Sequence, residues 1–207
     1  MREAGIGRVL VASLHQGIGD LMPTRLEFYE TWLNPDGLRL GTVGLAPLNA
    51  VLSFLREEGE VYGPVMARAG TYAADWLLTG RRLRGSPAFL ALPARFRARV
   101  AVGAAGRLIR TCYRGNRAVV RLRRGSGTLE VRGSVFCTVR EPVNAPLCVF
   151  YEALTARVLQ AYGLDATARV AACRATGAPA CQLAVAVDLR RRRERVPSAP
   201  RVGIAEP

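Results

Sequence analysis

The stretch "ATARVAACRATGAPACQLAVAV", residues 166–187, decides the class of fold. Two runs of alternating small apolar side chains, 166–173 and 181–187, flank a short connection that contains glycine and proline. Alternation of this kind is typical of a strand with one buried face, and a short connection pairs two such strands in the antiparallel sense. The stretch therefore predicts a β-hairpin with Cys173 and Cys181 at its mouth.

A second hairpin is predicted upstream. In "RAVVRLR", residues 117–123, arginine and apolar side chains alternate, and "RGSG" at 124–127 contains turn residues. In the following strand, the alternation of apolar side chains continues from Leu129 to Cys137 and Val139, which are therefore expected to belong to that strand. Between the two hairpins, "LCVFYEALTARVLQAYGL" has helical apolar spacing and ends at a glycine.

The first part of the chain has helical periodicity. Apolar spacing predicts two helical stretches within 8–33, then helices within 42–59, 62–78 and 91–113, with a turn at 34–37. Helices followed by hairpins indicate an α+β fold, in which N-terminal helices pack on one face of an antiparallel sheet of about four strands. We expect one domain over residues 1–188. Residues 189–207, with four consecutive arginines and three prolines, are expected to form a disordered tail that folding does not need.

The basic residues are all arginine, and their distribution is uneven. Residues 1–60 hold five arginines against eight acids, whereas residues 81–133 hold fourteen arginines against one acid. The net charge of +14 thus arises almost wholly in the second segment. Such a segment is either a solvated surface of a lysine-free protein, which we favour, or a site for an anion such as nucleic acid. The candidate anion-binding residues are Arg95, Arg99, Arg110, Arg117, Arg121 and Arg123.

Groups for catalysis are scarce. The single histidine, His15, lies in the first helical stretch, and no glycine-rich nucleotide loop follows a predicted strand. We therefore lean against an enzyme without excluding one, and name no catalytic residue. No apolar run is long enough to cross a bilayer, and five widely spaced cysteines do not form a secreted disulfide framework. A cytoplasmic protein with reduced thiols is expected.

The cysteines could be metal ligands or buried thiols. Cys148, Cys173 and Cys181 have the spacing C-x24-C-x7-C, and zinc would need Cys137 or a water as the fourth ligand. The chain has no C-x2-C pair. Strand alternation also turns Cys173 to the face opposite Cys181 unless a β-bulge intervenes. We therefore expect buried free thiols near the junction of the last helix and hairpin, with no metal and no other cofactor, and keep zinc as the minor alternative.

These C-terminal residues also carry a family resemblance. A strand led by glycine and serine spans 133–137, Cys148 opens the next helix, Gly163 ends it, and the pattern C-x-A-x-G-x3-C follows from Cys173. This combination resembles the 4-vinyl reductase domain, a family related in fold to the TRAPP vesicle-tethering subunits. About 55 residues, 133–187, carry the match.

The resemblance implies helices on one face of an antiparallel sheet and an apolar pocket between the two. In relatives such a pocket serves acyl chains, tetrapyrroles or other small molecules, the subunits often pair, and the cysteines have been suspected of binding metal. Relatives commonly place a glutamate three residues before the first hairpin cysteine, where this chain has Val170. That difference weakens a metal or proton-transfer role.

Three functions are consistent with these features. The first is a non-catalytic carrier or sensor domain for an apolar or amphipathic small molecule. The alternatives are an auxiliary factor or reductase of bacteriochlorophyll and tetrapyrrole synthesis, and an arginine-rich nucleic-acid-binding regulator. We also expect a homodimer, or a heterodimer with a similar chain, because the predicted helices hold more apolar surface than a short sheet can cover. The apolar residues behind that expectation are Leu48, Val51, Leu52, Leu55, Tyr72 and Trp76.

Overall fold

The fold was determined as a computed structural model that describes residues 6–33, 44–79 and 86–189. The turn predicted at 34–37 and nearly all of the predicted tail lie outside these residues. Among the described residues, no helix is long and apolar enough to cross a membrane.

The predicted helices are present, and their ends follow local sequence signals. Met22 and Pro23 separate the first two helices, and Pro93 stands directly before the longest one. A short helix at 87–91 was not predicted; it begins after Ser86, whose hydroxyl accepts a hydrogen bond from the Phe89 N–H. The helices are α1 (Arg8–Leu21), α2 (Leu26–Leu33), α4 (Leu45–Glu57), α5 (Tyr62–Leu78), α6 (Pro87–Ala91), α7 (Ala94–Cys112) and α8 (Val149–Ala161).

Four strands form one antiparallel sheet in the order β1-β2-β4-β3. The turn between the first two strands consists of Arg124 and Gly125, both with positive φ, as a two-residue hairpin turn of the favoured type requires. In this order β4, the last strand of the described residues, lies between β2 and β3 in the interior of the sheet. The strands are β1 (Arg117–Arg123), β2 (Ser126–Arg132), β3 (Ala166–Ala172) and β4 (Cys181–Val187).

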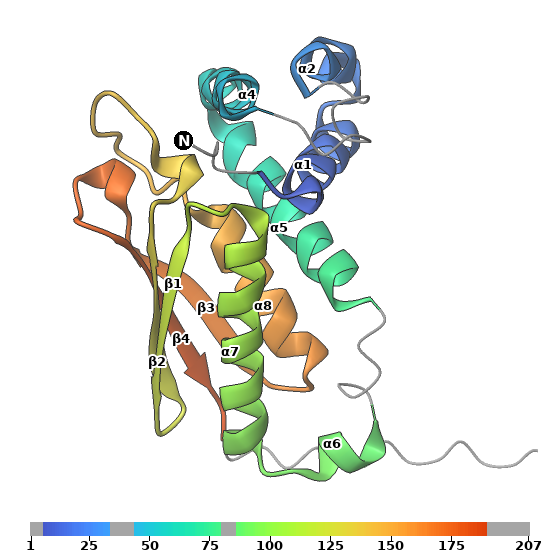
Figure 1. The fold of residues 1–207 in the computed structure, drawn as a ribbon, viewed down its shortest axis with the longest axis vertical. Coiled ribbons are helices and arrows are strands. Elements are labelled where there is room, and N and C mark those ends of the chain that lie inside the picture. The colour runs from blue at the N-terminus through green and yellow to red at the C-terminus, as the bar shows by residue number, and fades with distance from the viewer. Residues whose placement is uncertain (1–5, 34–43, 80–85, 190–207) are drawn as a thin grey trace, which may run out of the picture.

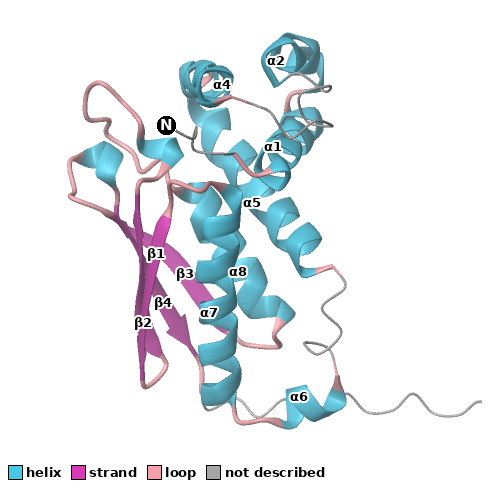
Figure 2. Ribbon diagram, in the orientation of Figure 1, coloured by secondary structure: helices cyan, strands magenta, loops and turns pink. Residues whose placement is uncertain are grey.

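The helices cover one face of this sheet (Figures 1 and 2). Helix α7 packs on β1 and α8 on β3, while α5 packs on α8 and α1 packs on α5. Side chains of β1 alternate between partly buried and exposed, as expected for a sheet with one covered face. The α+β prediction is therefore correct: N-terminal helices and a four-stranded antiparallel sheet form a shared core.

Helices α5 and α8 pack tightly against each other. Gly70 of α5 lies against the backbone of α8, and a Cβ atom at this position would collide with the carbonyl oxygen of Phe150. On the α8 side the neighbouring side chain is also small, since the Cβ atom of Ala153 would lie 3.1 Å from a Cβ atom at Gly70. Small side chains thus let the two helix backbones approach each other directly.

The second predicted strand ends earlier than its apolar pattern indicates. β2 stops at Arg132, Gly133 adopts a φ of +74°, and residues Val135–Cys137 form a 3-10 turn. The prediction that Cys137 and Val139 continue the strand is therefore wrong. A left-handed backbone at Gly133 breaks the extended conformation, and the alternation that follows it is coincidental.

The apolar surplus on the helices is smaller than the sequence indicates. Leu48, Val51, Leu52 and Leu55 are all fully buried within the chain, because α2 packs against α4. They therefore give no evidence for a second subunit. Trp76 is 40% exposed and stacks on Tyr72 at a ring-centroid distance of 5.5 Å.

Candidate metal centre

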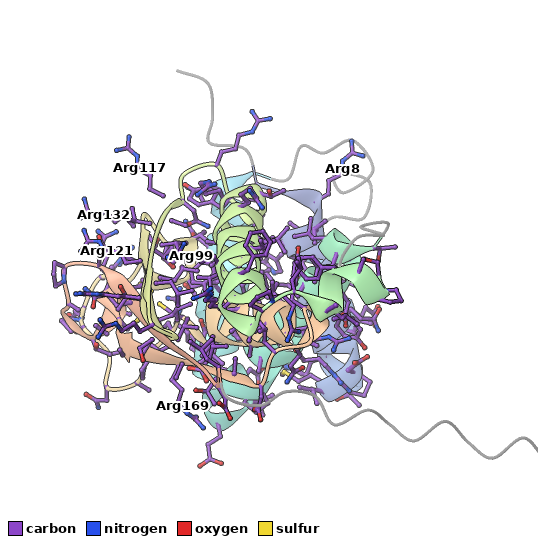
Figure 3. All side chains as sticks on the ribbon, turned by 90° about the horizontal axis from the view of Figure 1, so that it is seen from below. Arg8, Arg99, Arg117, Arg121, Arg132 and Arg169 are labelled. Atoms are coloured by element: carbon purple, nitrogen blue, oxygen red, sulfur yellow. The ribbon has the colours of Figure 1, made fainter. Side chains whose placement is uncertain are left out.

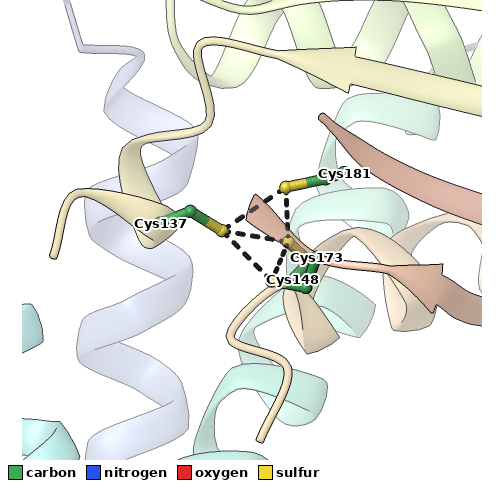
Figure 4. Close-up of side chains that lie close together, drawn as sticks. All are labelled: Cys137, Cys148, Cys173 and Cys181. Carbon is green, nitrogen blue, oxygen red and sulfur yellow. Dashed lines mark hydrogen bonds between the residues drawn. The ribbon is translucent and has the colours of Figure 1, made fainter. Parts of the chain in front are cut away.

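Four cysteines from four different segments converge at one end of the sheet (Figure 4). One comes from the 3-10 turn after β2, one caps the N-terminus of α8, one follows β3, and one begins β4. All four side chains are buried, and their sulfur atoms lie within 4.8 Å of one another. They are Cys137, Cys148, Cys173 and Cys181.

The spacing of the sulfur atoms is close to that of a tetrahedral metal site. The Sγ of Cys148 lies 2.9 Å from that of Cys181, 3.1 Å from that of Cys137 and 3.2 Å from that of Cys173. Zinc–sulfur bonds of about 2.3 Å in a tetrahedron place neighbouring sulfurs about 3.8 Å apart. The three distances from Cys148 are shorter than this by about 0.6 to 0.9 Å, so a small outward movement of the sulfurs would admit a zinc ion. The donor set fits the metal.

A β-bulge in β3 brings the two hairpin cysteines together. Val170 pairs with Leu183 while Ala172 pairs with Gln182, so β3 holds one extra residue. This shifts the side-chain alternation and turns Cys173 toward the side of Cys181. The argument from strand alternation against zinc is therefore wrong, and one of the reasons for expecting free thiols without metal no longer holds.

The connection between the hairpin cysteines is built around the sulfurs. Gly177 has a φ of +94°, which an L side chain rarely adopts, and Ala175 is fully buried. The backbone N–H of Arg174 donates a hydrogen bond to the Sγ of Cys181 at 3.5 Å. An N–H donor at this place stabilises a thiolate, as outer-shell donors do in metal sites.

The loop that carries Cys148 is tied to the rest of the fold at two points. The hydroxyl of Tyr62 on α5 donates to the carbonyl oxygen of Leu147 at 3.0 Å. The backbone N–H of Val143 donates to the carbonyl oxygen of Ala175 at 2.8 Å. The position of this sulfur is therefore set by α5 and by the hairpin connection together.

The thiols differ in acidity because they hydrogen-bond one another. Donation from Cys137, and then from Cys148 and Cys181, holds the pKa of Cys173 well below its ordinary value. The hydrogen bonds that Cys148 makes with Cys137, and then with the other two thiols, raise the pKa of Cys148. The fifth cysteine, Cys112, lies outside the cluster, and burial raises its pKa to about 12.

The structure separates the six arginines that the sequence groups as anion-binding candidates. Arg95 and Arg99 of α7 line a surface pocket, together with Arg124, which sequence reasoning missed because it was assigned to a turn. Arg110 donates to the carbonyl oxygen of Ala118 at 3.1 Å. The other three candidates, Arg117, Arg121 and Arg123, lie on the exposed face of β1. Figure 3 shows Arg117 and Arg121 on the side of the sheet away from the helices.

Two further polar residues have structural partners. The Nε2 atom of His15 lies 2.7 Å from a carboxylate oxygen of Glu30, so its partner is an acid rather than a nucleophile. Arg97 of α7 is only 7% exposed, and its guanidinium donates to the carbonyl oxygens of Tyr162 and Gly163. Arg97 thus joins α7 to the end of α8.

A solved structure shares this fold. No family model and no curated protein matches the sequence. The structure of an H-NOX protein from S. oneidensis in the Fe(II)NO ligation state is similar at a TM-score of 0.51 and 14% identity, covering 88% of this chain and 99% of that one. The phenol-responsive sensory domain of the transcription activator PoxR, with phenol, aligns at a TM-score of 0.46 and 19% identity, covering 69% of this chain and 74% of that one.

The likeness to the H-NOX protein concerns the fold. At 14% identity it extends over nearly the whole of both chains, and it supports the arrangement of helices and sheet that the sequence resemblance implied. Membership of the 4-vinyl reductase family stays a prediction, since no family model matches.

Proposed function

We propose that the protein is a non-catalytic ligand-binding domain, a sensor or carrier, whose fold is held together by a metal ion on four cysteines. The observation that carries the proposal is the convergence of four buried sulfurs from four segments. Four protein thiolates complete a tetrahedral shell and leave no open position for substrate, which is the pattern of a structural rather than a catalytic site. Zinc and iron are the metals that prefer four sulfur ligands.

When bound, the metal would crosslink the segment after β2, the start of α8 and both strands of the last hairpin. The four cysteines would supply the negative charge that balances the metal ion, because thiols bind metal as thiolates and release their protons on binding. The N–H of Arg174 offsets part of the negative charge that collects on the sulfurs. The glutamate that the family carries at the position of Val170 is not needed, because Cys137 supplies the fourth donor.

Metal analysis tests the metal part of this proposal. We expect one metal ion per chain in protein purified without chelators, colourless if zinc and coloured if iron. Removal by a strong chelator should lower the melting temperature by at least 10 °C, because binding to a structural site is worth about 10 kcal/mol or more of folding free energy. Metal-free protein whose melting temperature does not respond to added zinc would contradict the proposal.

Ligand binding is supported by the fold. The H-NOX protein of similar fold was solved with a small ligand on iron, and we carry over only the general property of holding a small molecule. The single histidine is paired with Glu30 rather than with a nucleophile. The tetrapyrrole and nucleic-acid alternatives stay predictions.

Subunit pairing also stays a prediction. The apolar residues of α4 no longer support it, because they are buried within the chain. The large apolar side chains that remain exposed on the helices include Phe28, Trp32 and Trp76. If these form a dimer contact, light scattering at micromolar concentration should give twice the chain mass of 22.4 kDa. Replacing Trp32 by glutamate should then yield monomer, whereas a monomeric unaltered protein would exclude the homodimer.

A further inference from the structure

A second site lies beyond the cysteine cluster, between the first turns of α7 and the β1–β2 turn. It is a pocket of about 460 Å³, within the range of small-molecule pockets. Its wall combines two kinds of side chain, cationic and apolar. The cationic ones are Arg95, Arg99 and Arg124, and the apolar ones include Phe96, Leu122 and Leu189.

The three arginines approach the pocket from two sides. Arg95 and Arg99 are one helical turn apart on α7, and Arg124 extends from the hairpin turn. Figure 3 shows Arg99 on the side of α7 that faces the sheet. The lining contains no carboxylate, and among the described residues none of the three guanidinium groups has a hydrogen-bond or ion-pair partner. Three arginines around one pocket favour an anionic ligand.

The position at the start of α7 strengthens this preference. The first turn of a long helix carries a partial positive charge, and α7 has 19 residues. Its first turn holds no acidic residue that would satisfy this charge from within the chain. An anion bound beside Arg95 would interact with the guanidinium group and with the helix terminus at once.

The apolar part of the wall distinguishes this pocket from a simple anion site. Phe96 is 50% exposed, and Leu122 and Leu189 are partly buried at the opposite wall. An aromatic ring left this open to water has apolar surface that a ligand could cover.

We propose that this pocket binds an amphipathic organic anion, with its carboxylate or other anionic head on the arginines and its apolar body over Phe96 and the two leucines. The inference names the ligand class for the binding function proposed above and rests on that function. It is independent of the metal, since the pocket and the cysteine cluster share no residue.

Calorimetric titration with octanoate tests the proposal on the metal-loaded full chain. We expect saturable binding of one octanoate per chain. Octanol, which lacks the charge, and inorganic phosphate, which lacks the apolar body, should each bind at least tenfold more weakly. Phosphate that binds as tightly as octanoate would overturn the amphipathic ligand and leave a plain anion site.

Variants connect the binding to the pocket. Arg95→Gln with Arg99→Gln should raise the octanoate dissociation constant at least tenfold, while the melting temperature and metal content stay unchanged. The matched control is Arg107→Gln, an exposed arginine on the same helix outside the pocket lining. Octanoate binding that is absent, or that survives the double replacement, would overturn this inference, and an intact metal content in the same sample would show that the metal proposal stands.

Discussion

A Cys148→Ser variant is expected to lose the metal and to melt at least 10 °C below the unaltered protein. The Sγ of Cys148 lies within 3.2 Å of the three other sulfurs, so its removal opens the coordination shell at the centre of the cluster. A hydroxyl is a poor replacement for a thiolate on a soft site. Because the four ligands join four segments, the loss of metal is also a loss of folding free energy.

The measurements are metal content, thermal melting and the absorption of the cobalt-substituted protein, whose sulfur-to-metal bands report thiolate ligation. Cys112 provides the matched control, because it is buried but lies outside the cluster. Cys112→Ala should keep a full metal content and the cobalt spectrum. A Cys148→Ser protein with the metal content and melting temperature of the unaltered chain would show that the cysteines are only packed thiols.

The second large effect is expected at the contact between α5 and α8. Gly70→Ala should lower the free energy of unfolding by about 3 kcal/mol, because the added methyl meets the Phe150 carbonyl oxygen and the α8 backbone. Backbone atoms of a packed helix cannot rotate away as a side chain can. Urea denaturation, with the slope compared between variants, measures the change.

Gly103→Ala is the control for this prediction. Gly103 also lies inside a helix, but a Cβ atom there would meet nothing within 4 Å. The alanine should therefore stabilise the protein by up to about 1 kcal/mol through its higher helix propensity. Equal effects of the two replacements would mean that the contact between α5 and α8 is looser than the structure has it.

The fold was predictable because its signals are local. Helical spacing such as that of Leu48, Val51 and Leu52 is a property of neighbouring residues, and so is the alternation in residues 117–123. The burial of the helices against each other was not predictable in the same way. The cover that α2 provides for α4 depends on which surfaces meet in three dimensions.

The convergence of the four cysteines was not predicted, for a physical reason that two residues illustrate. Gly133 takes a left-handed conformation and moves Cys137 out of the strand, and the bulge before Ala172 reverses the facing of Cys173. Each irregularity changes the direction of one cysteine, and spacing along the chain does not report it. The candidate ligands could thus be listed from the sequence, while their convergence could not.

The order of the strands has a consequence for how the chain can fold. Because β4 comes last in the described sequence yet pairs with both β2 and β3, it joins two pieces that have no other strand contact. Until β4 is in place, both neighbours expose unpaired backbone edges, which are templates for pairing with other molecules. Incomplete chains that end before Cys181 should therefore self-associate, and the late insertion of one central strand, with its long-range contacts, should limit the folding rate.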